Sequence, residues 1–273
     1  MHKSYVIKKE SLARDLFHYD SYSDEKISYA KKSDDVLIEI KDYIESNEEI
    51  DAKKIMGLMF PADTPHLFIS HKSQNANQAI RLANILHSEY KIKSFIDSQV
   101  WQHIDVIGKM INDKTSIMEV RDSKTIYNYK SADIVASNMF SMLSVALLET
   151  MDSSDGYLYI DSNDYDNNKI SSDNINQLIT KSPWLFLEAR YASMLRSKKQ
   201  KRPKITNDSY PMNESAGIEE LRKSGTSFSY EFPIGEAVHL DSLYNAFDFK
   251  GRADHPLKYL DLIYNNLDSN SRR

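Results

Sequence analysis

The sequence predicts an α/β protein whose parallel sheet is flanked by helices. Three apolar runs of strand length support this: His66 to Ser70, Ile92 to Ile96, and Gly156 to Asp161. An alanine-rich segment with apolar residues at helical spacing separates the first two runs. Because a strand, a helix of roughly 15 residues and a second strand make a βαβ unit, we expect these strands to be parallel, with a right-handed connection.

Helical patterns follow these strands along the rest of the chain. Ser182 is a good N-cap and Pro183 suits the first helical position, so a helix is predicted from there to about Arg196. Further helices are predicted near Val106–Ile111, over Asp133–Thr150 and over Leu257–Leu267, weaker strands over Phe228–Phe232 and Ala237–Leu240, and loops over 162–176 and 197–227.

Residues 1–62 are interpreted as a small, mainly helical N-terminal region. It contains a helix that Ser33 can cap, and Pro61 and Pro65 mark a boundary after it. The α/β domain is therefore expected to occupy residues 66–273. The N-terminal region is interpreted as a helical cap packed on that domain, or alternatively as a sensing or oligomerisation module.

Composition excludes several classes of site and partner. The 273-residue chain is 41% hydrophobic with a net charge of -5, which supports a full core and gives no electrostatic reason to expect nucleic acid. It has no cysteine, which removes thiolate metal sites and disulfides, and no glycine-rich phosphate loop. No secretory signal or bilayer-spanning stretch is recognised, so a cytoplasmic protein without a membrane partner is expected.

A metal site is not predicted. The eight histidines are scattered without metal-ligand spacing. The Asp- and Asn-rich run from Asp161 to Asp173 lacks the glycine and the final glutamate of an EF-hand loop, so it is interpreted as a solvated loop.

Three ordered segments resemble the Toll/interleukin-1-receptor (TIR) domain family, over about two-thirds of the chain. Leu67–His71 and the alanine-rich helix after it resemble the opening box of the family. Ile92–Asp97, with Trp101 beyond it, resembles the second strand and the functional loop. Gly156–Ser162 followed by Ser182–Glu188 resembles a later strand and the S-P-W-C-x-x-E helix start.

The resemblance implies a flavodoxin-like sheet and an activity. Bacterial TIR domains often cleave NAD⁺, and the glutamate of the last box, here Glu188, is their catalytic residue. NAD⁺ would be substrate rather than cofactor. Self-association through TIR–TIR contacts would gate the reaction, with the N-terminal region or an activating partner as trigger. The chain departs from the family at Leu185, where cysteine is usual, at Asn75, where aspartate is common, and in a longer insert before the third segment.

The chemistry suits a carboxylate at position 188. Cleavage of the nicotinamide–ribose bond builds oxocarbenium-like charge on the sugar, which a nearby carboxylate stabilises. Trp184 lies one turn away, where it would stack on a ligand ring or anchor the helix in the core. The helix alone favours an idle glutamate near the helix N-terminus, and the family resemblance is what favours a catalytic Glu188.

The other candidate substrate-binding residues lie at the expected carboxyl ends of the first two strands, where open parallel sheets bind ligands. For each of them a turn or packing role stays open. They are Phe68, Ser70, His71, Lys72, Asp97 and Trp101.

Two other functions compete with NAD⁺ cleavage. A non-enzymatic TIR module would act only as a signalling scaffold, although scaffolds commonly lack the glutamate that this chain keeps. A nucleoside deoxyribosyltransferase would also use a glutamate on a flavodoxin-like sheet, with nucleosides as substrates.

Overall fold

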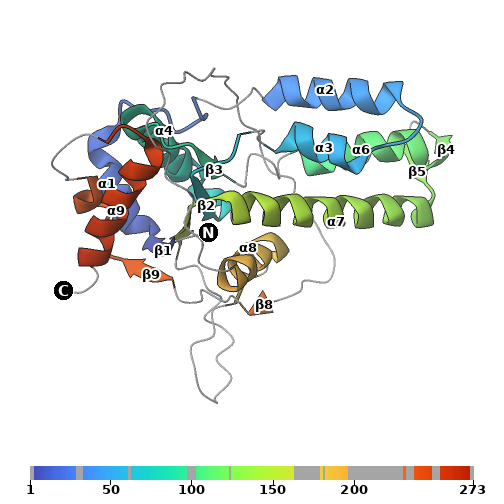
Figure 1. Cartoon of the computed structure of the whole chain (residues 1–273). Helices are drawn as coiled ribbons and strands as arrows, with labels where there is room; N and C mark the ends of the chain where they lie inside the picture. The colour runs from blue at the N-terminus through green and yellow to red at the C-terminus, as the bar shows by residue number, and fades with distance from the viewer. Residues whose placement is uncertain are drawn as a thin grey trace, which may run out of the picture.

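A five-stranded parallel sheet forms the centre of the molecule, in the order β3-β2-β6-β1-β9 (Figure 1). Its strands are β1 (Lys3–Lys8), β2 (Leu67–His71), β3 (Ser94–Ile96), β6 (Gly156–Asp161) and β9 (Val238–Leu240). The computed structural model describes residues 3–28, 33–60, 63–96, 103–122, 124–162, 179–180, 182–195, 230–231, 237–247 and 253–270. A parallel sheet flanked by helices is compatible with a flavodoxin-like fold, but the strand order, which is 3-2-4-1-5 when these five strands are numbered along the chain, differs from the 2-1-3-4-5 order of that fold.

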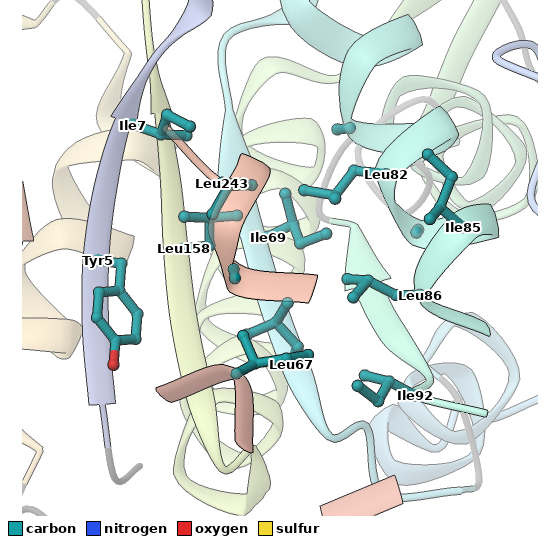
Figure 2. Packing of buried hydrophobic residues seen from close by; sticks show 14 of the residues in the cluster. Tyr5, Ile7, Leu67, Ile69, Leu82, Ile85, Leu86, Ile92, Leu158 and Leu243 are labelled. Carbon is teal, nitrogen blue, oxygen red and sulfur yellow. The ribbon is translucent and has the colours of Figure 1, made fainter. Parts of the chain in front are cut away.

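One face of the sheet packs against three helices, namely α1 (Lys9–Leu16), α4 (Ala76–Tyr90) and α9 (Pro256–Asn270). Alternate residues of each strand point to this face because side chains change sides with a period of two. Figure 2 shows Ile7 of β1, Ile69 of β2 and Leu158 of β6 on this side, with Leu82 and Leu86 of α4 packed toward them.

The opposite face is covered by a second group of helices: α2 (Ser33–Ser46), α3 (Ala52–Met59), α6 (Ile104–Thr115), α7 (Tyr129–Ser153) and α8 (Pro183–Met194). In Figure 1, α2, α3, α6 and α7 run beside one another away from the sheet. An antiparallel hairpin, β4 (Ile117–Arg121) and β5 (Lys124–Tyr127), lies at the far end of this helical arm. The shorter elements are η1 (Phe17–Tyr19), η2 (Ser73–Asn75), η3 (Tyr244–Phe247), β7 (Ile179–Thr180) and β8 (Tyr230–Glu231).

The predicted βαβ unit is confirmed. β2, α4 and β3 follow in order, and β2 pairs with β3 in parallel. The helices predicted near Val106, from Asp133, from Pro183 and from Leu257 are also present, as α6, α7, α8 and α9. The Ser182 hydroxyl caps α8 by accepting a 3.2 Å hydrogen bond from the Leu185 backbone N–H, as the Ser-Pro pair predicts.

The expectation that residues 1–62 form a helical region is wrong at its start. β1 lies inside the sheet, hydrogen-bonded to β6 on one side and β9 on the other. Tyr5, Val6 and Ile7 are all buried, and Asp268 of α9 accepts hydrogen bonds from the Lys3 ammonium at 2.6 Å and the Tyr5 hydroxyl at 3.0 Å. The sheet therefore runs across the predicted division between residues 62 and 66.

Helix α7 corrects a second expectation, that no segment is apolar enough to span a bilayer. Its 25 residues reach a mean hydropathy of 1.5 over the best window, and a third of that window is buried. By length and composition alone it is the single membrane-span candidate among the described helices. Leu143, Leu147 and Met151 pack into the protein core, whereas Ile134, Phe140 and Val145 are exposed, so core packing accounts for only part of the apolar character of α7.

A close approach at the start of β6 requires glycine. A Cβ atom on Gly156 would lie 3.0 Å from Leu67 Cδ1 and well inside the contact distance of the buried Tyr264 hydroxyl. We expect Gly156→Ala to lower the free energy of unfolding by about 1–3 kcal/mol, as overpacking does. Urea unfolding of Gly156→Ala, Tyr264→Phe and the double variant measures this. Because Tyr264→Phe removes the clashing oxygen, the double variant should lose less stability than the sum of the single variants.

His66 makes the stability of the fold pH-dependent. Its Nδ1 accepts a 2.9 Å hydrogen bond from the Lys93 backbone N–H. Burial, followed by the nearby His255 and Lys93 charges, lowers the pKa of His66 from 6.5 to about 4. As the pH falls through 6.5 the unfolded chain binds a proton that the folded chain does not take up until the pH nears 4, so stability must decrease across that window.

The measurement is the free energy of unfolding in urea between pH 7 and pH 4, compared with His66→Gln. The variant should lack a slope component of at most about 1.4 kcal/mol per pH unit. Equal slopes for the two proteins would show that His66 does not carry this dependence.

Candidate functional site

The order of the sheet makes the carboxyl ends of β2 and β6 a place where a ligand is expected to bind. The helix after β2, α4, covers one face of the sheet, whereas the helix after β6, α8, covers the other. In open α/β sheets, neighbouring strands whose connections leave on opposite faces define a ligand-binding crevice at their carboxyl ends. Ser70 and His71 of β2 reach this edge, as do Asp161 of β6 and Ser162 after it, and all four are buried.

Glu188 of α8 lies against this edge. Its side chain is 0% exposed, and its Oε2 accepts a 2.5 Å hydrogen bond from the Ser70 hydroxyl. The two residues are 118 positions apart in the chain. Leu185 and Ala189 of the same helix pack into the core and fix its orientation. Burial of a carboxyl group is costly without such a donor, so Ser70 stabilises Glu188 at this position.

Further polar groups lie at the same strand edge, between β2 and the start of α4. The Nδ1–H of the buried His71 donates to the Lys72 carbonyl at 2.7 Å, which in a neutral ring leaves Nε2 as an acceptor. Asn75, 1% exposed, donates through Nδ2 to the Ile160 carbonyl at 3.3 Å. Asn75 Oδ1 is buried and accepts no hydrogen bond from the described residues. The carboxyl edge of β2 and β6 therefore carries several hydrogen-bonding groups.

Two predicted site residues have clear packing contacts. Phe68 is 0% exposed, with its ring centroid 5.1 Å from that of Phe95 and 6.0 Å from that of Tyr157. The Trp184 ring lies 5.0 Å from that of Phe140 on α7. Phe68 belongs to the core beneath the Ser70–Glu188 pair, and Trp184 anchors α8 to α7. Direct contact of either ring with a ligand stays a prediction.

The structure thus brings Glu188 and Ser70 into contact. His71 and the half-buried Lys72 follow Ser70 at the same end of β2, where the His71 side chain points to the opposite face of the sheet from Ser70. Asp97 and Trp101 lie outside the described residues. Sequence reasoning did not single out Asn75 as a site residue, although a polar residue directly before an alanine-rich helix is a recognisable N-cap signal. No grouping of three or more metal-ligating side chains occurs within the described ranges.

Fold and site together define an α/β protein with a parallel sheet and a buried Ser–Glu pair at its carboxyl edge. Comparison with protein-family models, with curated protein sequences and with solved structures finds no match.

Proposed function

We propose that this protein is an NAD⁺ glycohydrolase or cyclase of the bacterial TIR type, active in an immune or toxin-like system. The observation that carries the proposal is the Ser70–Glu188 pair, which holds a carboxyl group against the edge where parallel sheets bind ligands. The choice of NAD⁺ as the substrate rests on the ordered sequence segments that resemble TIR domains.

In this proposal Glu188 is the catalytic residue. As the bond between nicotinamide and C1′ of the ribose breaks, the bonding electrons leave with neutral nicotinamide and positive charge develops on the sugar. The carboxylate stabilises that charge, or attacks C1′ as a nucleophile before water releases ADP-ribose. Ser70 acts as a positioning residue, because its hydroxyl holds the carboxyl group from β2. His71 and Lys72 offer hydrogen bonds and positive charge to ribose and phosphate groups.

The complete burial of Glu188 has a consequence for regulation. A carboxyl group with 0% exposure cannot meet a ribose, so the proposal requires that this conformation is a resting one. We infer that activity requires a rearrangement that exposes Glu188, and that self-association supplies it. The isolated chain is therefore expected to turn over NAD⁺ slowly at low protein concentration.

The test is nicotinamide release from NAD⁺ by the purified full-length chain, across protein concentrations and with and without a crowding agent. The proposal predicts release that rises more steeply than linearly with protein concentration. A parallel panel of nucleosides and deoxynucleosides tests the deoxyribosyltransferase alternative. Absence of NAD⁺ cleavage under all assembly conditions would remove the enzymatic proposal and leave a binding module.

A further inference from the structure

Strand β4 of the β4–β5 hairpin is exposed along its length, and its outer edge has no neighbouring strand among the described residues. All five residues of β4 are exposed, including Met118 at 70% and Val120 at 63%. β4 and β5 form a sheet of only two strands, and no other described strand pairs with either of them. A two-stranded sheet is marginally stable by itself, and a free edge is a template for another strand.

The register of the hairpin shows which backbone groups are free. Arg121 pairs with Lys124 across the turn, and Asp122 has the positive φ of 49° that tight hairpin turns require. A two-residue turn closes on a hydrogen-bonded pair, so Arg121 and Glu119 direct their N–H and C=O groups to β5. Val120 between them must then direct its N–H and C=O groups away from β5, to the open edge.

The side chains on this edge are self-complementary. Consider two copies of β4 paired antiparallel about a two-fold axis at Val120. Val120 then faces Val120 of the second copy, and Glu119 of each copy faces Arg121 of the other. In an in-register parallel pair, by contrast, Glu119 would face Glu119 of the second copy and Arg121 would face Arg121. Charged residues on an edge normally discourage pairing, but this order of charges favours one specific arrangement, because each pair across the axis has opposite charges.

The ion pair between Glu119 and Arg121 within one chain can be replaced by the same pairs between two chains. Within one chain Arg121 Nη2 lies 3.1 Å from Glu119 Oε1, and the two side chains are 68% and 45% exposed. An ion pair this exposed contributes little to the stability of the hairpin. Exchanging the one pair in each of the two chains for two equivalent pairs across the two-fold axis therefore costs little. The register irregularity between Ile117 and Glu119 lies outside the three residues that would pair.

We propose that β4 is a self-association site through which a second copy of this chain adds its own β4, giving a four-stranded sheet β5-β4-β4-β5. The interface is independent of whether Glu188 cleaves NAD⁺. It lies at the end of the helical arm formed by α2, α3, α6 and α7, remote from strand β2, which carries Ser70 (Figure 1). Since the paired edge is short, the association is expected to be weak and concentration-dependent.

Sedimentation velocity of the full-length chain over a concentration series tests the site with charge reversals. Glu119→Arg and Arg121→Glu should each weaken self-association by about tenfold or more, because each places like charges across both pairs. An equimolar mixture of the two variants restores opposite charges at every pair, so it should associate at least as tightly as the wild type. A role of the ion pair only within one chain would not produce this recovery in the mixture.

A matched pair of proline variants tests the edge itself. Val120→Pro removes the outward N–H of β4, whereas Thr125→Pro removes the corresponding outward N–H of β5, its partner in the hairpin. Only Val120→Pro should abolish association, with far-UV circular dichroism confirming that both variants fold. A wild-type chain that stays monomeric throughout, or charge variants that associate alone like the wild type, would overturn the proposal.

Discussion

Glu188→Gln should lower nicotinamide release from NAD⁺ by about three orders of magnitude or more, since loss of one group that stabilises transition-state charge has effects of this size. Glutamine has almost the same shape and keeps a carbonyl oxygen, so the Ser70 hydroxyl can still donate to residue 188. The variant loses the negative charge without leaving a cavity or an unsatisfied hydroxyl. Its free energy of unfolding should therefore stay close to that of the wild type.

The control for this prediction is a second change in the same pair. Ser70→Ala keeps the carboxyl group but removes its donor from β2, so the activity should fall less than in Glu188→Gln while the stability falls more, by about 1–3 kcal/mol. If Glu188→Gln cleaves NAD⁺ at the wild-type rate, the carboxylate is not the catalytic group.

Phe68→Ala should lower the free energy of unfolding by about 3–5 kcal/mol, which is the usual cost of removing a fully buried aromatic ring. Phe68 is 0% exposed and lies between the rings of Phe95 and Tyr157 at the middle of the sheet. Truncation leaves a cavity directly beneath the Ser70–Glu188 pair. Chemical unfolding in urea, followed by tryptophan fluorescence and circular dichroism, measures the loss.

Phe68→Leu separates packing from ligand contact at this position. As a core residue, Phe68 should tolerate leucine at a smaller cost in stability than alanine, since leucine fills part of the volume. A folded Phe68→Leu protein with unchanged stability and a raised KM for NAD⁺ would instead place the ring against the substrate.

The central βαβ unit could be predicted because its local patterns agree with its tertiary environment. β2 and β6 are buried on both faces, so they read as continuous apolar runs, and α4 carries its apolar residues on the face that meets the sheet. The Ser182 cap of α8 could likewise be predicted, because it depends only on residues that are close together in the sequence.

Other parts of the fold depend on contacts between distant residues. β1 has only six residues, and its place between β6 and β9 is decided by pairing across some 150 and 230 positions of sequence, respectively. Its hydrogen bonds to Asp268 are equally remote. The β4–β5 hairpin is exposed, so burial imposes no alternating pattern on it.

The sequence predicts which residues belong to the candidate site, but not how their side chains are arranged. The S-P-W-L-F-L-E segment singles out Glu188, and the end of an apolar strand singles out Ser70. That these two side chains share a hydrogen bond depends on how α8 packs across β2. The complete burial of Glu188 follows from the same packing. Because a buried carboxyl group cannot contact a substrate, this burial is why we expect activity to require a rearrangement that exposes Glu188.

A crystal structure of the full-length Glu188→Gln protein grown with NAD⁺ tests most directly whether the carboxyl edge between β2 and β6 is the substrate site. We predict that the nicotinamide ribose binds there with its C1′ atom in contact with the side chain of residue 188, within about 4 Å, and that this side chain has become accessible. NAD⁺ bound elsewhere on the molecule, with residue 188 still enclosed against Ser70, would contradict the proposed function.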